Sequence, residues 1–286
     1  MSGNGLSDRP VTSVRFEKMH GLGNDFMLVD TRHHRLFPDM AHIRQWADRH
    51  HGVGFDQLIL LSPSRQAGYL AEYRFFNADG SSAEQCGNGQ RCLGRYLWTS
   101  GWADTPVFRV TGPGGPVSIV VHAADDVEIS LPEPRCRLAV SPGEHQRLEW
   151  AEVDVGNPHH VRWVDSVQQV NLAAVAREVR RGYPEGVNVE VVEVVSPSRL
   201  RIRIDERGCG ETRACGSGAA AAAVATVKRS QLTEPQTVRV DMPGGALLVN
   251  YDPRQETLSL RGAATHVYQG RLFVPSERLD ISGDKS

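Results

Sequence analysis

The sequence predicts an α+β fold of two pseudo-symmetric halves, each a mostly antiparallel sheet wrapped around a central helix, with the functional site in the cleft between them. Three observations predict this fold. The chain repeats itself at a nearly constant spacing, alternating strands outnumber helices in both copies, and one helix is apolar on every face. With 286 residues, 40% of them hydrophobic and 23% charged, the chain is long enough for two domains of ordinary size.

The internal repeat consists of five matches that occur in the same order in both copies. Cys86 and Cys215, for example, are 129 residues apart. We therefore predict an N-terminal half over 1–131, completed by the C-terminal segment 268–286, and a C-terminal half over 132–267. The other matched segments are Gly23-Asn24 with Gly156-Asn157, GFDQLIL (54–60) with GVNVEVV (186–192), VFRVTGPGGPVSIVV (107–121) with TVRVDMPGGALLVNY (237–251), and EISL (128–131) with TLSL (257–260).

Each copy predicts the same order of elements. A strand and a Gly-Asn turn precede a helix, at 39–51 in the first copy and at about 171–181 in the second. Two alternating strands follow, then a Cys-Gly-x-Gly turn that opens a second helix, then a hairpin through Pro-Gly-Gly. The second helix of the second copy, AAAAAVATV, is small and apolar all round, which is typical of a fully buried helix. The predicted helix caps are Asp39 and Gly52, and Asn171 and Gly182.

Composition excludes several classes of function. A net charge of −2 gives no basic surface for nucleic acid, and no apolar run reaches the roughly 20 residues that span a membrane. The N-terminus lacks a signal peptide, so we expect a cytoplasmic protein. Five cysteines, an odd number without any C-x-x-C pair, argue against a disulfide framework and against structural zinc. Lysine is scarce, which leaves few candidates for pyridoxal phosphate chemistry, and we expect neither a cofactor nor a metal.

Two cysteines occupy equivalent places at the starts of the two second helices. Unpaired N–H groups and the helix dipole should lower the pKa of Cys86 and Cys215 from about 8.5 and bind an anion beside them. The neighbouring glycines let a carboxylate approach the backbone. Two thiols beside a carboxylate site suit removal of a proton from the α-carbon of an amino acid and its return on the opposite face. Cys92, Cys136 and Cys209 are more simply interpreted as small buried hydrophobic residues.

These residues resemble the diaminopimelate epimerase family over about 14–275. The resemblance implies cofactor-free interconversion of LL- and meso-diaminopimelate, in lysine and peptidoglycan precursor synthesis, with two cysteines as the acid/base pair. It is carried by MHGLGNDF (19–26), GFDQ (54–57), FNADGSSAEQCGNGQRC (76–92), GNPHHV (156–161), GVNVE (186–190) and DERGCGETRACGSG (205–218).

The resemblance also implies the site residues. Cys86 and Cys215 would be the two bases, and His159 would support them. Diaminopimelate carries two carboxylates and two ammonium groups, so its distal carboxylate suits an arginine fork and its ammonium groups need carboxylate and amide oxygens. The implied substrate-binding residues are Asn24, Gln57, Asn77, Gly87, Asn88, Asn157, Asn188, Glu206, Arg207, Gly216 and Ser217.

Other functions stay open at this stage. A related two-cysteine racemase could act on proline, hydroxyproline or a basic amino acid, although Asn77, Asn188 and Arg207 favour a substrate with a distal carboxylate. A thiol–disulfide or metal-binding protein and a binding module without catalysis are the alternatives outside this enzyme class. We expect the halves to close over a small-molecule substrate. The sequence allows a homodimer without requiring one.

Overall fold

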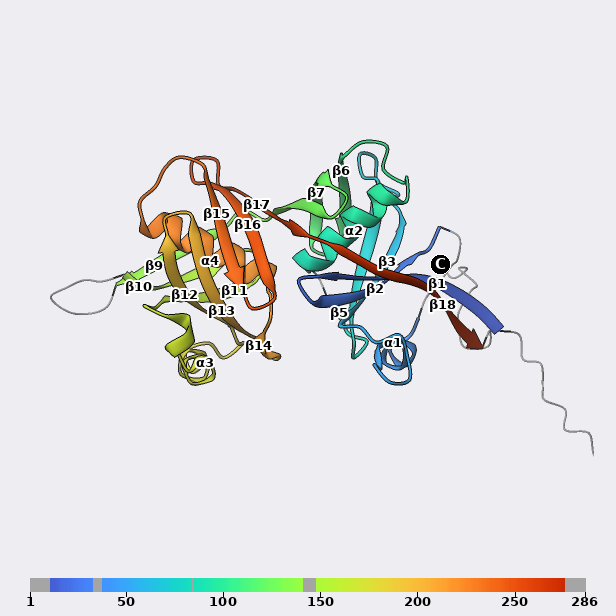
Figure 1. Cartoon of the computed structure of the whole chain (residues 1–286), viewed down its shortest axis with the longest axis horizontal. Coiled ribbons are helices and arrows are strands. Elements are labelled where there is room, and N and C mark those ends of the chain that lie inside the picture. The colour runs from blue at the N-terminus through green and yellow to red at the C-terminus, as the bar shows by residue number, and fades with distance from the viewer. Residues whose placement is uncertain (1–10, 33–37, 84, 141–147, 276–286) are drawn as a thin grey trace, which may run out of the picture.

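The structure is a computed structural model that describes residues 11–32, 38–83, 85–140 and 148–275. Figure 1 shows two lobes side by side, with the strand β18 running from the second lobe back into the first. In chain order the first half comprises β1 (Val11–Gly21), β2 (Asn24–Asp30), α1 (Met40–Ala47), β3 (Gln57–Pro63), β4 (Ala71–Asn77), β5 (Ser82–Ala83), α2 (Gly87–Thr99), β6 (Val107–Gly112), β7 (Gly115–Ala123) and β8 (Asp126–Leu131). The second half comprises β9 (Arg135–Val140), β10 (Leu148–Asp154), β11 (Pro158–Trp163), the 3₁₀ turn η1 (Val167–Gln169), α3 (Leu172–Arg180), β12 (Asn188–Ser196), β13 (Arg199–Glu206), β14 (Gly210–Thr212), α4 (Gly216–Arg229), β15 (Gln236–Met242), β16 (Gly245–Asp252) and β17 (Thr257–Ala263), followed by β18 (Thr265–Pro275).

Strand pairing repeats from one half to the other. In the first half β1–β2, β3–β4, β6–β7 and β7–β8 are antiparallel, while β2–β3 and β4–β6 are parallel. The second half has the same order: β10–β11, β12–β13, β15–β16 and β16–β17 antiparallel, with β11–β12 and β13–β15 parallel. This confirms the predicted repeat and the mostly antiparallel sheets.

Two further antiparallel pairings connect distant parts of the chain. One joins the two halves, and the other joins the last described strand to the first. β8 pairs with β17 across the junction, so one continuous ladder runs through both halves. β18 pairs with β1, as β9 pairs with β10 in the second half. The last described strand therefore lies beside the first one, as Figure 1 shows.

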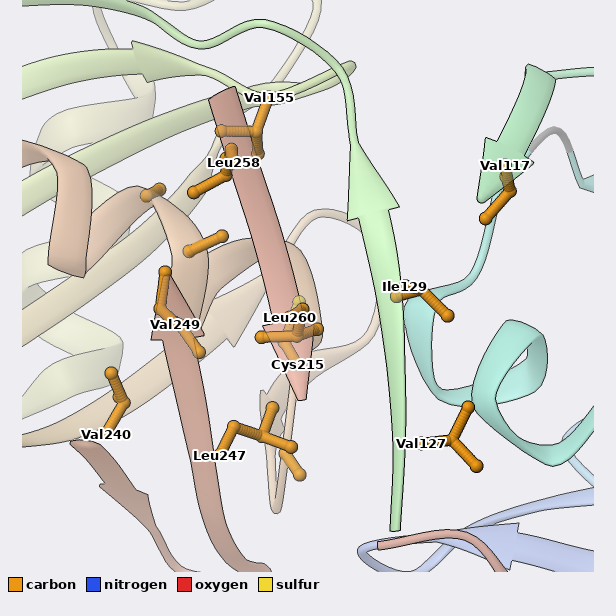
Figure 2. Close-up of a cluster of buried hydrophobic side chains, with 14 of the residues drawn as sticks. Val117, Val127, Ile129, Val155, Cys215, Val240, Leu247, Val249, Leu258 and Leu260 are labelled. Carbon is orange, nitrogen blue, oxygen red and sulfur yellow. The ribbon is translucent and has the colours of Figure 1, made fainter. Parts of the chain in front are cut away.

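The two central helices lie inside these sheets. Every residue of α4 from Gly218 to Val227 is buried, because alanine and valine side chains leave no polar face to turn outward. This confirms the prediction made from the small apolar run. Figure 2 shows the core at the junction, which includes Cys215 and in which Ile129 of β8 pairs with Leu260 of β17. Burial of these side chains fixes the start of α4 against the first half.

The outer helices begin where the sequence predicts, and α3 also ends there, at Arg180, but α1 ends earlier. The side chains of Asp39 and Asn171 accept N–H bonds in the first turns of α1 and α3. However, α1 ends at Ala47, not at 51, because the carboxylate of Asp48 accepts the backbone N–H groups that follow it. Gly52 is thus not a cap. It is needed because the chain passes so close to α1 that an added Cβ would lie 2.3 Å from a carbonyl oxygen.

Candidate active site

The two cysteines predicted from the repeat stand at the two central helix starts. Cys86 is the N-cap residue of α2 and Cys215 that of α4, and both have extended backbones and no side-chain capping bond. The fold brings these starts together, since a Cβ added to Gly216 would lie 3.9 Å from the Cα of Gly87. Backbone N–H groups of the first turns face the sulfur atoms. The site therefore lies at the junction of the halves.

The prediction of lowered thiol pKa values is wrong. Burial raises the pKa of Cys86 to about 11 and that of Cys215 well above its ordinary range. The negative charge of Glu206 contributes to both increases, whereas the helix N–H groups act in the opposite direction. Cys215 is only 7% exposed. The free-energy cost of desolvating its thiolate therefore exceeds the stabilisation that the N–H groups and dipole at the helix start provide.

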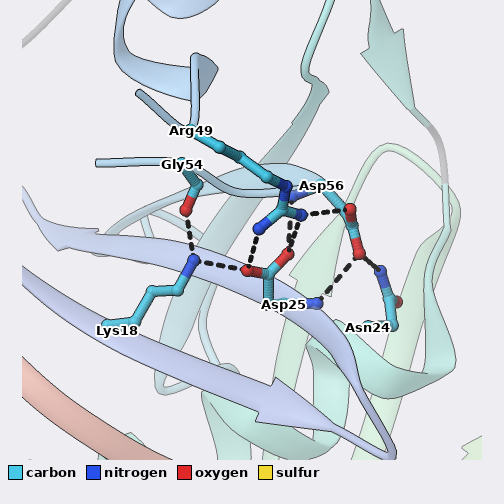
Figure 3. A network of polar contacts seen from close by, with 6 residues as sticks. All are labelled: Lys18, Asn24, Asp25, Arg49, Gly54 and Asp56. Carbon is cyan, nitrogen blue, oxygen red and sulfur yellow. Dashed lines mark hydrogen bonds and ion pairs between the residues drawn. The ribbon is translucent and has the colours of Figure 1, made fainter. Parts of the chain in front are cut away.

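An amide oxygen accepts a hydrogen bond from Cys86. Asn24 Oδ1 lies 3.5 Å from Cys86 Sγ and also accepts from Asn88 Nδ2 at 3.2 Å. Asn24 Nδ2 donates to the carboxylate of Asp56 at 3.0 Å (Figure 3). Because a carboxylate can only accept, Asp56 fixes the Asn24 amide with its oxygen toward the thiol.

A charged network holds Asp56 in place. Arg49 donates to Asp25 and to Asp56, each at 2.8 Å, and Lys18 pairs with Asp25 at 2.5 Å (Figure 3). Burial alone would raise the pKa of Asp25, but hydrogen bonds from Arg49 and Lys18 and their charges hold it well below its usual value. This network was not predicted, although Asp56 stands inside the GFDQ motif.

The buried guanidinium of Arg91 holds the side-chain amide of Asn88. Arg91 is fully buried in α2 and donates to Asn88 Oδ1 at 2.7 Å and to the carbonyl of Gly87 at 3.3 Å. Its charge lowers the pKa of Cys86, opposing burial. The repeat places Ala220 at this position in α4, and that difference was a signal that the sequence prediction did not use.

A different chain of polar groups leads to Cys215. Its sulfur lies 3.4 Å from Ser217 Oγ, which accepts from Asn157 Nδ2 at 3.4 Å. Asn157 Oδ1 in turn lies 3.1 Å from His159 Nε2. The opposite ring nitrogen contacts Glu190 Oε1 at 2.6 Å. Glu190 is a second residue that the sequence prediction missed.

The remaining predicted residues lie at strand ends in equivalent pairs. Gln57 begins β3 directly opposite Asn77, the last residue of β4, and donates to it at 2.9 Å. In the second half Asn188 begins β12 and accepts the backbone N–H of Arg207 at 2.9 Å. Glu206 ends β13, and its charge influences both thiols. The Arg207 side chain is exposed and donates to the carbonyl of Glu185.

The other cysteines divide into core and surface residues. Cys92 is fully buried and Cys136 packs against the core, as predicted. Cys209 is exposed, so its prediction as a buried residue is wrong. It lies in a tight turn between Gly208 and Gly210, both with positive φ, and its side chain therefore has no core to pack into. Within the described parts of the chain, no three His, Cys, Asp or Glu residues cluster in a way that could hold a metal ion. None of the helices described is long and apolar enough to cross a membrane.

Known proteins share both the sequence and the fold. The family model described as diaminopimelate epimerase matches residues 16–135 and 152–267. A protein of Stutzerimonas stutzeri named diaminopimelate epimerase is 36% identical over 276 residues, covering 91% of this chain and 99% of the relative. A protein of the same name from Pseudomonas aeruginosa (strain UCBPP-PA14) is 36% identical over 274 residues with the same coverage.

More distant solved structures share the fold alone. A Bacillus anthracis phenazine biosynthesis protein of the PhzF family aligns with a TM-score of 0.71 at 14% identity, covering 92% of this chain and all of that one. A hydroxyproline epimerase from Agrobacterium vitis aligns with a TM-score of 0.68 at 13% identity, covering 94% of each chain. With a family match across both halves and relatives at 36% identity along nearly their whole length, this chain belongs to the diaminopimelate epimerase family.

Proposed function

We propose that the protein converts LL-diaminopimelate to meso-diaminopimelate by a two-base mechanism without a cofactor. The observation that carries the proposal is the meeting of two helix starts, each bearing a thiol, at the junction of two equivalent halves. Cys86 and Cys215 would then lie on opposite faces of the substrate α-carbon. One thiolate removes the α-proton and the other thiol donates its own proton to the opposite face, so the pair exchanges protonation states.

Substrate binding itself would generate the thiolate. At neutral pH each thiol carries its proton before substrate binds, because burial and the charge of Glu206 raise both pKa values. When Glu206 accepts the substrate ammonium group, its negative charge is neutralised and the thiol pKa values fall. One thiol then loses its proton to solvent. The first-turn N–H groups of α2 and α4 donate hydrogen bonds to the α-carboxylate and stabilise the charge that develops there.

The polar residues around the thiols would divide the remaining substrate groups. We assign the α-carboxylate to the helix-start residues Gly87, Asn88, Gly216 and Ser217, and the distal carboxylate to the guanidinium of Arg207. The ammonium groups would contact Glu206 and amide oxygens. The amides in this assignment are Asn24, Gln57, Asn77 and Asn188, whereas Asn157, supported by His159 at its oxygen, would donate an N–H to the α-carboxylate.

Deuterium exchange at the α-carbon tests this function. Purified protein in D₂O under reducing conditions should incorporate deuterium into LL- and meso-diaminopimelate, and not into proline, hydroxyproline or lysine. Cys86→Ser and Cys215→Ser should each abolish epimerisation, whereas the exposed Cys209→Ser should retain it. Full turnover in both active-site variants would show that the thiols are not the bases. Exchange with proline alone would favour the related racemases.

We also propose the organisation of the protein around this activity. The division into halves over 1–131 and 132–267, with 268–286 returning to the first half, is supported by the pairing of β18 with β1. A homodimer is supported by the exposed apolar side chains of β18, namely Val267, Tyr268 and Phe273. Sedimentation analysis tests the dimer. Free thiols and a net charge of −2 support a cytoplasmic protein with no nucleic-acid partner.

A further inference from the structure

The two central helices pass equally close to their sheets, but to different kinds of side chain. Gly89 and Gly218 are the third residues of α2 and α4. A Cβ added to Gly89 would lie 3.1 Å from a ring carbon of Phe26, and one added to Gly218 would lie 2.8 Å from Glu190 Oε1. The start of α2 therefore rests on the rings of Phe26 and Phe75, whereas the start of α4 rests on the carboxylate of Glu190 as well as on Ile204.

Strand register identifies two pairs of equivalent positions in the repeat, Phe26 with His159 and Ile59 with Glu190. Phe26 of β2 pairs with the first residue of β3, and His159 of β11 pairs with the first residue of β12. Two residues further along those strands are Ile59 in the first half and Glu190 in the second. Where the first half buries a phenylalanine and an isoleucine, the second half buries a histidine and a glutamate. The first half thus serves as an internal control for what the fold requires.

The histidine–glutamate pair is not needed to stabilise the fold. Both side chains are fully shielded from solvent and meet at 2.6 Å between Nδ1 and Oε1. Glu190 Oε2 is also buried and has no hydrogen-bond partner among the described residues. An incompletely paired buried carboxylate is destabilising, and an apolar pair of similar size is often as stable or more so. Phe26 and Ile59, both fully buried, demonstrate that this fold accommodates the apolar pair.

The pair connects to Cys215 through a chain of hydrogen bonds, in which the Asn157 amide sets the direction of the bond to His159. Asn157 Oδ1 faces His159 Nε2 at 3.1 Å, and an amide oxygen can only accept, so Nε2 carries a hydrogen. Nδ1 and Glu190 Oε1 meet at 2.6 Å, a contact that requires a proton between them, because a bare ring nitrogen and a carboxylate oxygen are both acceptors. With its oxygen held by His159, Asn157 turns its Nδ2 toward Ser217 Oγ, which contacts the sulfur of Cys215.

We propose that Glu190 is a positioning residue for the Cys215 side of the site. Its carboxylate keeps a proton at His159 Nδ1 while Nε2 also carries one, and this orients the Asn157 amide with its N–H groups toward Ser217 and the substrate carboxylate. Without the carboxylate a neutral imidazole keeps only one ring proton, and the Asn157 amide can invert. The catalytic consequence rests on the proposed function, whereas the orientation of His159 and Asn157 does not.

The test is Glu190→Gln, which preserves shape and removes the charge. In the wild-type protein, ¹⁵N-detected imidazole spectra should show both ring nitrogens of His159 protonated, and in the variant only one. The kcat/KM for α-proton exchange should fall about 10- to 100-fold. This is the effect expected when inversion of the Asn157 amide turns its oxygen toward the substrate carboxylate, which then lacks a donor. Glu193→Gln is the matched control: it lies in the same strand and loses an ion pair with Arg201, but its spectra and kcat/KM should match the wild type.

A double variant separates positioning from folding. His159→Phe with Glu190→Ile reproduces the apolar pair of the first half, and we expect a folded protein with Tm equal to or above that of the wild type and no epimerase activity. Unchanged His159 spectra with unchanged kcat/KM in Glu190→Gln would overturn the proposal, as would failure of the double variant to fold. If the wild-type protein does not exchange diaminopimelate, the proposed function fails, and the His159 spectra still decide the positioning role.

Discussion

Cys86 should ionise about two pH units higher than an ordinary cysteine. Burial, together with the smaller contribution of the nearby charge of Glu206, raises its pKa from 9.0 to about 11. A two-unit shift lowers the thiolate fraction at pH 8 by about a hundredfold, from roughly one in ten to roughly one in a thousand. Because only the thiolate is alkylated, the reactivity of this thiol should keep rising with pH up to about 11.

Pulsed alkylation measures this ionisation directly. Brief exposure to iodoacetamide at a series of pH values, followed by digestion and mass spectrometry, gives the rate for the peptide that contains Cys86. The midpoint of the pH dependence reports the pKa and does not depend on how easily the reagent reaches the sulfur. The same chain unfolded in guanidinium is the control, with an expected midpoint near 9. Circular dichroism verifies that the protein stays folded during each pulse.

One result would refute this reasoning. A folded-state midpoint at or below that of the unfolded chain would mean that the N–H groups at the start of α2 and the charge of Arg91 outweigh burial. The sequence-based prediction of a lowered pKa would then be correct, and substrate binding would not be needed to generate the thiolate.

Three further changes test neighbouring parts of the site and fold. Glu206→Gln removes a charge that raises the pKa of both active-site thiols, so both alkylation midpoints should move to lower pH; midpoints that stay in place would remove Glu206 from this role. Asp56→Asn lets the Asn24 amide invert, so kcat/KM measured by deuterium exchange should fall about two- to tenfold, and an unchanged value would contradict the orientation argument. Gly52→Ala places a methyl group 2.3 Å from a carbonyl oxygen of α1 and should lower the free energy of unfolding in urea by about 1–3 kcal/mol. Gly182→Ala, where the added Cβ makes an ordinary 3.6 Å contact, is its control and should change the stability by less than about 0.5 kcal/mol; equal losses in the two variants would be inconsistent with a steric cause.

Patterns that depend on periodicity or repetition predicted the fold well. The separation of 129 residues between Cys86 and Cys215 identified equivalent helix starts, and the structure brings these starts so close that a Cβ added to Gly216 would lie 3.9 Å from the Cα of Gly87. The alanine-rich run predicted a buried helix because a helix without a polar face has no side that is stable in contact with water. Asp39 and Asn171 were correct as N-caps because their capping bonds are local.

Properties that depend on tertiary surroundings could not be predicted in this way. The thiol pKa values differ from the expectation because the depth of burial is set by how the two halves meet, which local sequence does not encode. Glu190 looks like any glutamate in an alternating strand until the register places it beneath α4. Arg91 likewise reads as a surface residue of an amphipathic helix, yet it is fully buried.

The differences between the halves are as informative as the repeat. At equivalent positions, α2 carries the cation Arg91 where α4 carries Ala220, and the second half buries Glu190 where the first buries Ile59. The charge of Arg91 lowers the pKa of Cys86, and the charge of Glu190 raises that of Cys215. A two-base site with identical surroundings would give neither thiol priority for ionisation. These differences break the symmetry electrostatically, because a neighbouring cation favours the thiolate of Cys86 and a neighbouring carboxylate disfavours that of Cys215.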